Sequence, residues 1–209
     1  MTDAKAGQPF VYLASRSPRR QDLLRQIGVR FEELRFREAE GRPPDVVEGA
    51  LDAEPPHHYV ERIARTKATV GWQQVQRRVL PHRPVLAADT EVALDASIFG
   101  KPLDAQDATR MLTRLSGRTH QVFTAVALRW QDELVVELSR SDVTFRRLDA
   151  DEIERYVATG EAFDKAGGYA IQGRAGAFVA RLEGSYSGVM GLPLFETAEL
   201  LARIGFPAL

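Results

Sequence analysis

The chain has 209 residues, with 28 basic and 29 acidic side chains and a formal net charge of -1 at pH 7. This balance gives no reason to expect binding to nucleic acid or to a membrane surface. The absence of cysteine excludes disulfides, a thiol nucleophile and thiolate-bound metal centres. The first residues lack the apolar core of a signal peptide, and no later run has the length of a membrane span, so we expect a cytoplasmic protein.

The first part of the chain predicts a strand, a tight turn and a helix suited to binding an anion. Residues 10–13 form a short apolar run, and Ser17 followed by Pro18 is typical of a helix start. Arg19 and Arg20 then stand in the first helical turn, where the helix dipole disfavours cations. Backbone N–H groups, serine hydroxyls and the two guanidinium groups would together cradle a polyphosphate. The alternative is that both arginines are simply solvated.

The next segments predict a strand at residues 29–34, a long loop at 35–56 and a helix at 57–78. The loop contains four prolines and six acidic residues, one of which could reach a metal ion. Lys67 lies on the apolar stripe of the helix. A lysine at such a position either lays its methylene groups on the core surface or takes part in chemistry, and the pattern leaves both open.

A carboxylate follows the apolar run of the strand predicted at residues 85–94. Burying the charge of Asp89 is unfavourable unless it is paired or bound to a metal. If the strand continues through Glu91, the two carboxylates share one face and repel each other. If the strand bends at Asp89 and Thr90, both of these line a cleft, as polar residues at strand ends often do. A third alternative is a carboxylate satisfied by backbone donors.

The second half of the chain predicts an antiparallel hairpin, so the sheet is expected to be mixed. Its strands are residues 121–130 and 133–145. The other expected elements are a turn at 98–102, helices at 105–116, 150–159 and 193–204, strands at 169–171 and 177–182, and a loop at 185–191.

Further cations stand on turns beside glycine, at Lys101, Arg118 and Lys165. Each is ordinarily a solvated loop residue, but together with the two arginines they could supply the positive charge that a triphosphate needs. Other chemistries lack their motifs. The four histidines have no metal-ligand spacing, and no G-x-S-x-G elbow, P-loop or dinucleotide fingerprint is present.

Six blocks of the sequence stand in the order in which they occur in the Maf family. They are LASRSPRR at 13–20, ADT at 88–90, GKP at 100–102, LSGRTH at 115–120, DKAGGYAIQG at 164–173 and GSYSGVMGLP at 184–193. The chain thus resembles Maf proteins over nearly its whole length. The resemblance implies a single Maf-like domain over residues 1–209, with an extended loop at 35–56. It implies an elongated mixed α/β fold in which helices flank a central mixed sheet and two lobes enclose a cleft, similar to inosine triphosphate pyrophosphatases.

The resemblance also implies an activity. Maf proteins are nucleoside triphosphate pyrophosphatases, and this chain would release pyrophosphate by attack of water at the α-phosphorus, with Mg²⁺ or Mn²⁺ as cofactor. Asp89 and Lys101 match catalytic positions. Asp89 would either accept the proton of the water or ligate the metal, and Glu40 would be a second ligand. The substrate-binding positions are Ser15, Ser17, Arg19, Arg20, Lys67, Thr90, Lys165 and Gln172.

Arg20, Thr90 and Gln172 match specificity positions of the branch that acts on dTTP and UTP. Modified pyrimidine nucleotides are further expected substrates. The sister branch, which resembles a 7-methyl-GTP pyrophosphatase, has Glu where Gln172 stands. A glutamine amide complements the N3–H and O4 of uracil or thymine, whereas a carboxylate accepts twice. The alternative function is a regulator of septum formation that binds nucleotide without essential catalysis. A homodimer is expected in either case.

Overall fold

The computed structural model describes residues 9–37, 43–95 and 97–206, and within them seven strands form one sheet. The strands are β1 (Val11–Leu13), β2 (Phe31–Glu33), β3 (Val85–Leu94), β4 (Ser97–Phe99), β5 (Thr119–Trp130), β6 (Glu133–Phe145) and β7 (Val179–Glu183). Their order is β2-β1-β3-β5-β6-β7, with β4 paired to β3 off this path. The β2, β1 and β3 strands are parallel, and the remaining pairs are antiparallel. The expected mixed sheet is therefore confirmed.

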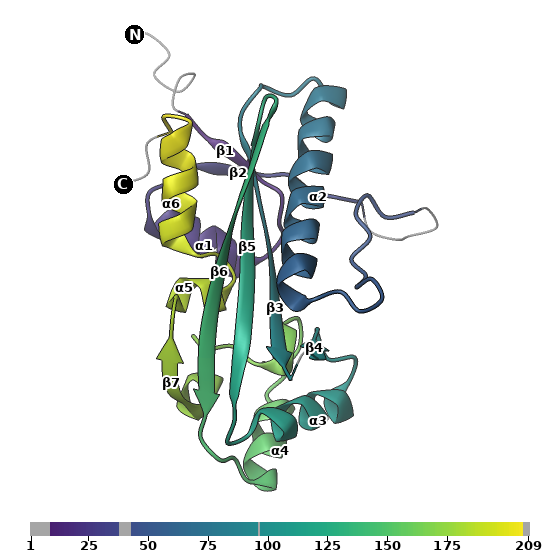
Figure 1. Cartoon of the computed structure of the whole chain (residues 1–209), viewed down its shortest axis with the longest axis vertical. Coiled ribbons are helices and arrows are strands. Elements are labelled where there is room, and N and C mark those ends of the chain that lie inside the picture. Colours follow the sequence, from purple (N-terminus) through teal and green to yellow (C-terminus); the bar gives the residue numbers. More distant parts are fainter. Residues whose placement is uncertain (1–8, 38–42, 96, 207–209) are drawn as a thin grey trace.

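Helices cover both faces of this sheet. They are α1 (Pro18–Gln26), α2 (Pro56–Arg77), α3 (Ala105–Leu115), α4 (Ala150–Ala158), α5 (Tyr186–Met190) and α6 (Leu194–Arg203), with 3₁₀ helices η1 (Ala166–Gly168) and η2 (Arg174–Phe178). Figure 1 shows α2 on one side of the long β5–β6 hairpin and α6 on the other. None of the helices in the described ranges is long and apolar enough to cross a membrane.

Strand alternation sends neighbouring side chains of β3 to different helices. Val85 and Ala87 pack against α2, whereas Leu86 and Ala88 pack with α1 and α6. Gly71 lets α2 approach β3 closely, because an added Cβ would lie 2.8 Å from Cγ1 of Val85. The direction in which each residue of β3 points is thus set by its place in the alternation.

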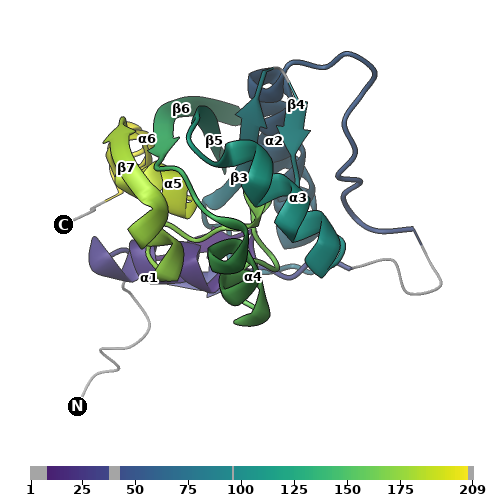
Figure 2. The ribbon, with the colours of Figure 1, turned by 90° about the horizontal axis from the view of Figure 1, so that it is seen from below.

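The packing on the two faces of β3 forms two hydrophobic cores. A third core surrounds the far end of β5 and β6, where α3, α4, η1 and η2 pack around Phe145. Figure 2, seen from that end, shows α3 and α4 together there. The molecule is elongated (Figure 1), with one lobe built on α1, α2 and α6 and a second on α3 and α4. This confirms the expected two-lobed mixed α/β fold.

Three segments differ from the sequence-based expectation. Residues 169–171 form no strand and lie between η1 and η2. Gly167 and Gly168, with φ of 71° and 69°, turn the chain just before them. In the segment expected to be a loop at 185–191, Ser185 instead caps α5 by accepting a hydrogen bond from the backbone N–H of Gly188 at 3.0 Å. The turn expected at 98–102 includes the end of β4.

Candidate active site

The site lies where one edge of β3 has no strand partner in the described part of the chain. On this edge Leu86 pairs with Leu13 of β1, and Val92 pairs with Phe99 of β4. The opposite edge of β3 is paired with β5 from Val85 to Ala93. Side chains from both faces of β3 therefore reach the opening between β1 and β4. Those at the opening are Asp89, Thr90 and Glu91.

A cavity of about 740 Å³ occupies this opening and is lined by residues from both lobes. Its volume is in the range of small-molecule sites. Glu40 lies outside the described residues. Arg118, which the sequence grouped with the triphosphate-binding cations, does not line the cavity and instead donates from Nη2 to Asp95 Oδ2 at 2.6 Å on the surface. The cavity is lined by the ten other predicted site residues, namely Ser15, Ser17, Arg19, Arg20, Lys67, Asp89, Thr90, Lys101, Lys165 and Gln172. The structure thus brings these residues together, while their individual roles stay predictions.

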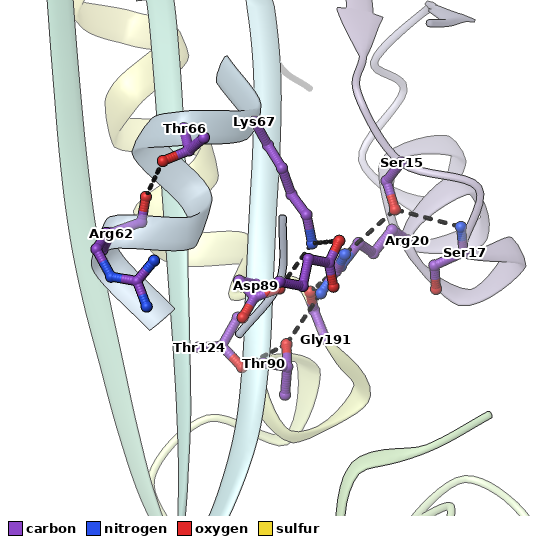
Figure 3. Close-up of polar contacts among 11 residues, drawn as sticks. Ser15, Ser17, Arg20, Arg62, Thr66, Lys67, Asp89, Thr90, Thr124 and Gly191 are labelled. Carbon is purple, nitrogen blue, oxygen red and sulfur yellow. Dashed lines mark hydrogen bonds and ion pairs between the residues drawn. The ribbon is translucent and has the colours of Figure 1, made fainter. Parts of the chain in front are cut away.

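Asp89 and Lys67, which both line the cavity, form a buried ion pair. Asp89 is on the face of β3 that packs against α2, and the Nζ of Lys67 donates to its Oδ1 at 2.7 Å (Figure 3). Only 6% of Asp89 and 8% of Lys67 are exposed. Burial raises the pKa of the Asp89 carboxyl above its ordinary value, while the charges of Lys67 and Arg20 limit the rise. Such a carboxylate is a better proton acceptor near neutral pH than an exposed aspartate.

Two further carboxylates reach the same cavity. Strand β3 continues unbroken through Glu91, so Asp89 and Glu91 share one face, as the first alternative predicted. Burial, followed by the like charges of Asp89 and Glu48, raises the pKa of Glu91 to about 8. The Oε1 of Glu48 lies 2.9 Å from Lys67 Nζ. The sequence included Glu48 only among six acidic loop residues, and no local pattern distinguishes it from the others.

These carboxylates fit a divalent cation that shares its coordination with substrate. The described residues contain no group of three or more metal-ligating side chains arranged as a complete site. Magnesium is commonly held by one or two carboxylates, with substrate phosphates and water supplying the other oxygens. The Oε2 of Glu91 is buried without a hydrogen-bond partner among the described residues, and Glu91 is one of the residues that line the cavity, as is Asp89. Hard oxygen donors of this kind suit Mg²⁺ or Mn²⁺.

Arg20 on α1 is held by three hydrogen bonds (Figure 3). Its Nε donates to the carbonyl oxygen of Gly191 at 2.7 Å, its Nη1 to Ser15 Oγ at 3.2 Å and its Nη2 to Thr90 Oγ1 at 3.1 Å. Gly191 has a φ of 117°, which favours glycine. Burial lowers the pKa of the Arg20 guanidinium, and the charge of Asp89 opposes this effect. The guanidinium is thus anchored at the cavity wall.

The start of α1 differs in one detail from the prediction. Ser17 is the N-cap residue, as expected, but its side chain makes no capping hydrogen bond. Its backbone N–H instead donates to Ser15 Oγ at 3.2 Å, the same hydroxyl oxygen that accepts from Arg20. The turn is therefore fixed by Ser15.

Cations from the two lobes face each other across the cavity. Burial, followed by the positive charge of Arg19, lowers the pKa of Lys165. Burial also lowers the pKa of Arg19, although Asp164 acts in the opposite direction. Lys101 and Gln172 are exposed at the cavity lining. An anion bound between these cations would relieve their mutual repulsion.

The fold and the cavity define a mixed α/β protein whose cation-lined cleft surrounds a buried lysine–aspartate pair, an arrangement suited to a polyphosphate. A sequence model of the family described as Maf-like protein matches residues 10–204. The chain belongs to the Maf family.

Several named proteins are similar to this chain. The dTTP/UTP pyrophosphatase of Aromatoleum aromaticum is 57% identical over 96% of this chain and 98% of its own length. That of Nitrosomonas europaea is 54% identical over 93% of this chain and 94% of its own. Among solved structures, the Ham1 protein of Staphylococcus aureus has a TM-score of 0.45 and 14% identity, covering 65% of this chain and 71% of that one.

Proposed function

We propose that this protein is a nucleoside triphosphate pyrophosphatase that hydrolyses dTTP and UTP to the monophosphate and pyrophosphate. The names of its relatives support the substrate class. The observation that carries the proposal is the buried pair of Asp89 and Lys67, which opens onto a cleft lined by cations from both lobes. A triphosphate chain bound along those cations would present its phosphorus atoms beside the carboxylate.

In this proposal, cationic side chains of both lobes bind the triphosphate. Arg19 and Arg20, at the amino-terminal end of α1, supply guanidinium forks where the helix also offers free N–H groups. Lys101 and Lys165 approach from the second lobe as point charges. Charge that develops on the phosphate oxygens as the bond to the leaving pyrophosphate breaks is stabilised by these groups.

Asp89 accepts the proton of the attacking water in this mechanism. The water oxygen bonds to the α-phosphorus, the bond from that phosphorus to the bridging oxygen breaks, and the proton goes to the carboxylate. Lys67 holds the carboxylate in place, and its positive charge opposes the rise that burial causes in the pKa of Asp89. A divalent cation held by one or two of the cavity carboxylates, with substrate phosphates and water as its other ligands, would neutralise charge on the phosphate oxygens. The competing assignment is that Asp89 binds the metal ion and is not the proton acceptor.

We assign recognition of the nucleobase to Gln172 at the edge of the cavity. Gln172 is exposed there on the segment between η1 and η2. Its amide can accept from the N3–H of uracil or thymine and donate to O4. We therefore expect pyrimidine triphosphates, including modified ones, to be preferred.

The resemblance further leads us to propose one Maf-like domain over residues 1–209, a cytoplasmic location, and assembly as a homodimer. The match of the family model to residues 10–204 supports the single domain. Light scattering tests the assembly, since one chain has a mass of 23.3 kDa and a dimer would have twice that.

The activity is tested with a panel of dTTP, UTP, 7-methyl-GTP and ATP in the presence of Mg²⁺ or Mn²⁺. Release of monophosphate plus pyrophosphate from dTTP and UTP is expected. Release of the diphosphate plus phosphate, or no turnover of any triphosphate, would contradict the proposal, and the latter result would favour a binding protein without catalysis.

The role of Asp89 is tested with Asp89→Asn, which keeps the size of the side chain. We expect kcat to fall by about 10²- to 10⁴-fold. The matched control is Asp132→Asn in the turn between β5 and β6, which should leave kcat unchanged. Undiminished pyrophosphate release by Asp89→Asn would show that Asp89 is neither the proton acceptor nor an essential ligand. Mn²⁺ affinity, measured without substrate, separates these two roles, since only loss of a ligand lowers it.

A further inference from the structure

A chain of hydroxyl groups runs from the cavity wall across two strands to α5. Thr124 on β5 stands opposite Thr90 on β3 in the antiparallel register. Its Oγ1 lies 3.0 Å from Thr90 Oγ1 and 2.8 Å from the carbonyl oxygen of Gly188, and the residue is 1% exposed. Figure 3 shows Thr124 next to Thr90, on the far side from Arg20. Thr124 is not one of the residues that line the cavity.

The Thr124 hydroxyl is the donor in both of its hydrogen bonds, to the carbonyl oxygen of Gly188 and to Thr90 Oγ1. A threonine hydroxyl has one hydrogen, so Thr124 shares that hydrogen between the two acceptors. Thr90 Oγ1 also accepts from Nη2 of Arg20 at 3.1 Å. The hydroxyl oxygen of Thr90 is thus the acceptor shared by Arg20 and Thr124.

These bonds close a ring around Arg20. The Nε of Arg20 also donates to Gly191, which ends the helix that contains Gly188. The ring thus joins α1, β3, β5 and α5. One consequence follows for the cavity: Arg20, with three of its five N–H groups used, keeps two for an anion.

We propose that Thr124 is a positioning residue that sets the orientation of Arg20 through Thr90 and thereby strengthens binding of the substrate phosphates. This inference rests on the proposed function, because it takes Arg20 as a phosphate ligand. Without the Thr124 hydroxyl, Thr90 Oγ1 loses one of the two donors that hold it, and the Thr90 side chain is free to leave the orientation in which it accepts from Arg20. The carbonyl of Gly188 still accepts from the N–H of Gly191 at 2.9 Å, so α5 should stay folded.

The first test compares dTTP kinetics of wild type, Thr124→Val and Thr124→Ser. Valine keeps the shape of threonine, and serine keeps the hydroxyl. For Thr124→Val we expect KM to rise about five- to tenfold with kcat changed by less than about twofold, as for loss of one hydrogen bond that orients a binding group. Thr124→Ser should restore KM to within about twofold of wild type. An unchanged KM in Thr124→Val, or an equal rise in Thr124→Ser, would overturn the proposal.

The matched control is Thr119→Val on the same strand. The hydroxyl of Thr119 pairs with that of Thr144 at 2.8 Å on the exposed surface. The variant therefore removes a threonine pair across β5 and β6 without touching Arg20. Its KM should equal that of wild type, and a rise matching that of Thr124→Val would show that the effect is a general weakening of the sheet.

A double-mutant cycle tests whether Thr124 acts through Thr90. If it does, the variant carrying both Thr90→Val and Thr124→Val should have nearly the KM of Thr90→Val alone. If the KM of the double variant instead rises by the product of the two single-variant fold-changes, Thr124 does not act through Thr90.

A readout that does not depend on turnover separates this proposal from the proposed function. The Nε–H of Arg20 donates to Gly191, so its NMR signal should exchange slowly with solvent in wild type and faster in Thr124→Val. Absence of triphosphate turnover by wild type would refute the proposed function alone. Equal exchange rates in the two proteins would refute the role of Thr124, whatever the activity.

Discussion

The ammonium of Lys67 lies 2.7 Å from a carboxylate oxygen of Asp89 at the unpaired edge of β3, and both residues are more than nine-tenths buried. Alternation along β3 explains why these two residues meet, since Asp89 has the same parity as Val85 and Ala87, which pack against α2. Removal of two charges from water is unfavourable, and each charge is tolerated here because of the other. The pair is therefore a point where stability and the proposed chemistry depend on the same contact.

Lys67→Met should destabilise the fold, because it leaves the Asp89 carboxylate buried without its partner. We expect the free energy of unfolding in urea at neutral pH to fall by about 3 kcal/mol. The control is Arg203→Met, which removes an ion pair with Glu137 at the surface, where the side chains are 54% and 34% exposed. Arg203→Met should lower the free energy of unfolding by less than about 1 kcal/mol. Similar losses of unfolding free energy in both variants would contradict the idea that burial makes the ion pair of Lys67 and Asp89 more important for stability than a surface ion pair.

The buried His120 should make stability depend on pH. Its Nε2 lies 2.8 Å from the hydroxyl of Tyr169, and burial lowers its pKa from 6.5 to about 4. Between these values the unfolded chain binds a proton that the folded chain does not. The free energy of unfolding should therefore fall as pH is lowered through this window, by about 3 kcal/mol from this residue.

His120→Gln isolates this contribution, since glutamine can also bond to Tyr169 but does not titrate. Urea unfolding of both proteins across the window should give a shallower pH dependence for the variant. Carboxylates that titrate at low pH contribute equally to both curves, so the difference between them belongs to His120. Parallel curves would contradict the prediction.

The parts of the fold that local sequence determines were predicted well. The β5–β6 hairpin and the helices with side-chain caps, such as α3 behind Asp104, are confirmed. Residues 169–171 were predicted wrongly because a β-prone composition cannot form a strand without a partner strand. Their path is set instead by distant contacts, for example the bond from the Gly167 N–H to the carbonyl of Gly100 at 3.1 Å.

The residues of the candidate site were likewise only partly predictable from sequence. Asp89 could be singled out because a carboxylate directly after a buried apolar run is unusual. Glu48 could not, because only the path of the long loop brings it to Lys67. Thr124 could not either, since its contact with Thr90 depends on the register of β3 against β5 and on the position of α5.

Glu91→Gln should stabilise the metal-free protein at alkaline pH. Burial and two neighbouring carboxylates raise the pKa of Glu91 from 4.5 to about 8, so the folded chain holds a proton that the unfolded chain has lost. Stability from this group therefore declines as pH rises through that window, and glutamine avoids the decline. Above the window, with EDTA present, the variant should gain about 5 kcal/mol in urea unfolding. Near pH 5 the gain should be small, and an equal gain at both pH values would contradict this explanation.

Gln172→Glu should change the ranking of substrates without changing the fold. The glutamine amide can pair with one donor and one acceptor on uracil, whereas a glutamate offers only acceptors and would place a negative oxygen opposite O4. We expect kcat/KM for UTP to fall by about tenfold or more, while turnover of 7-methyl-GTP, whose guanine edge presents paired N–H donors, rises relative to UTP. The control is Gln73→Glu on the exposed side of α2, which adds the same charge away from the cavity. An unchanged ratio of UTP to 7-methyl-GTP turnover in Gln172→Glu would mean that base selection resides elsewhere in the cleft.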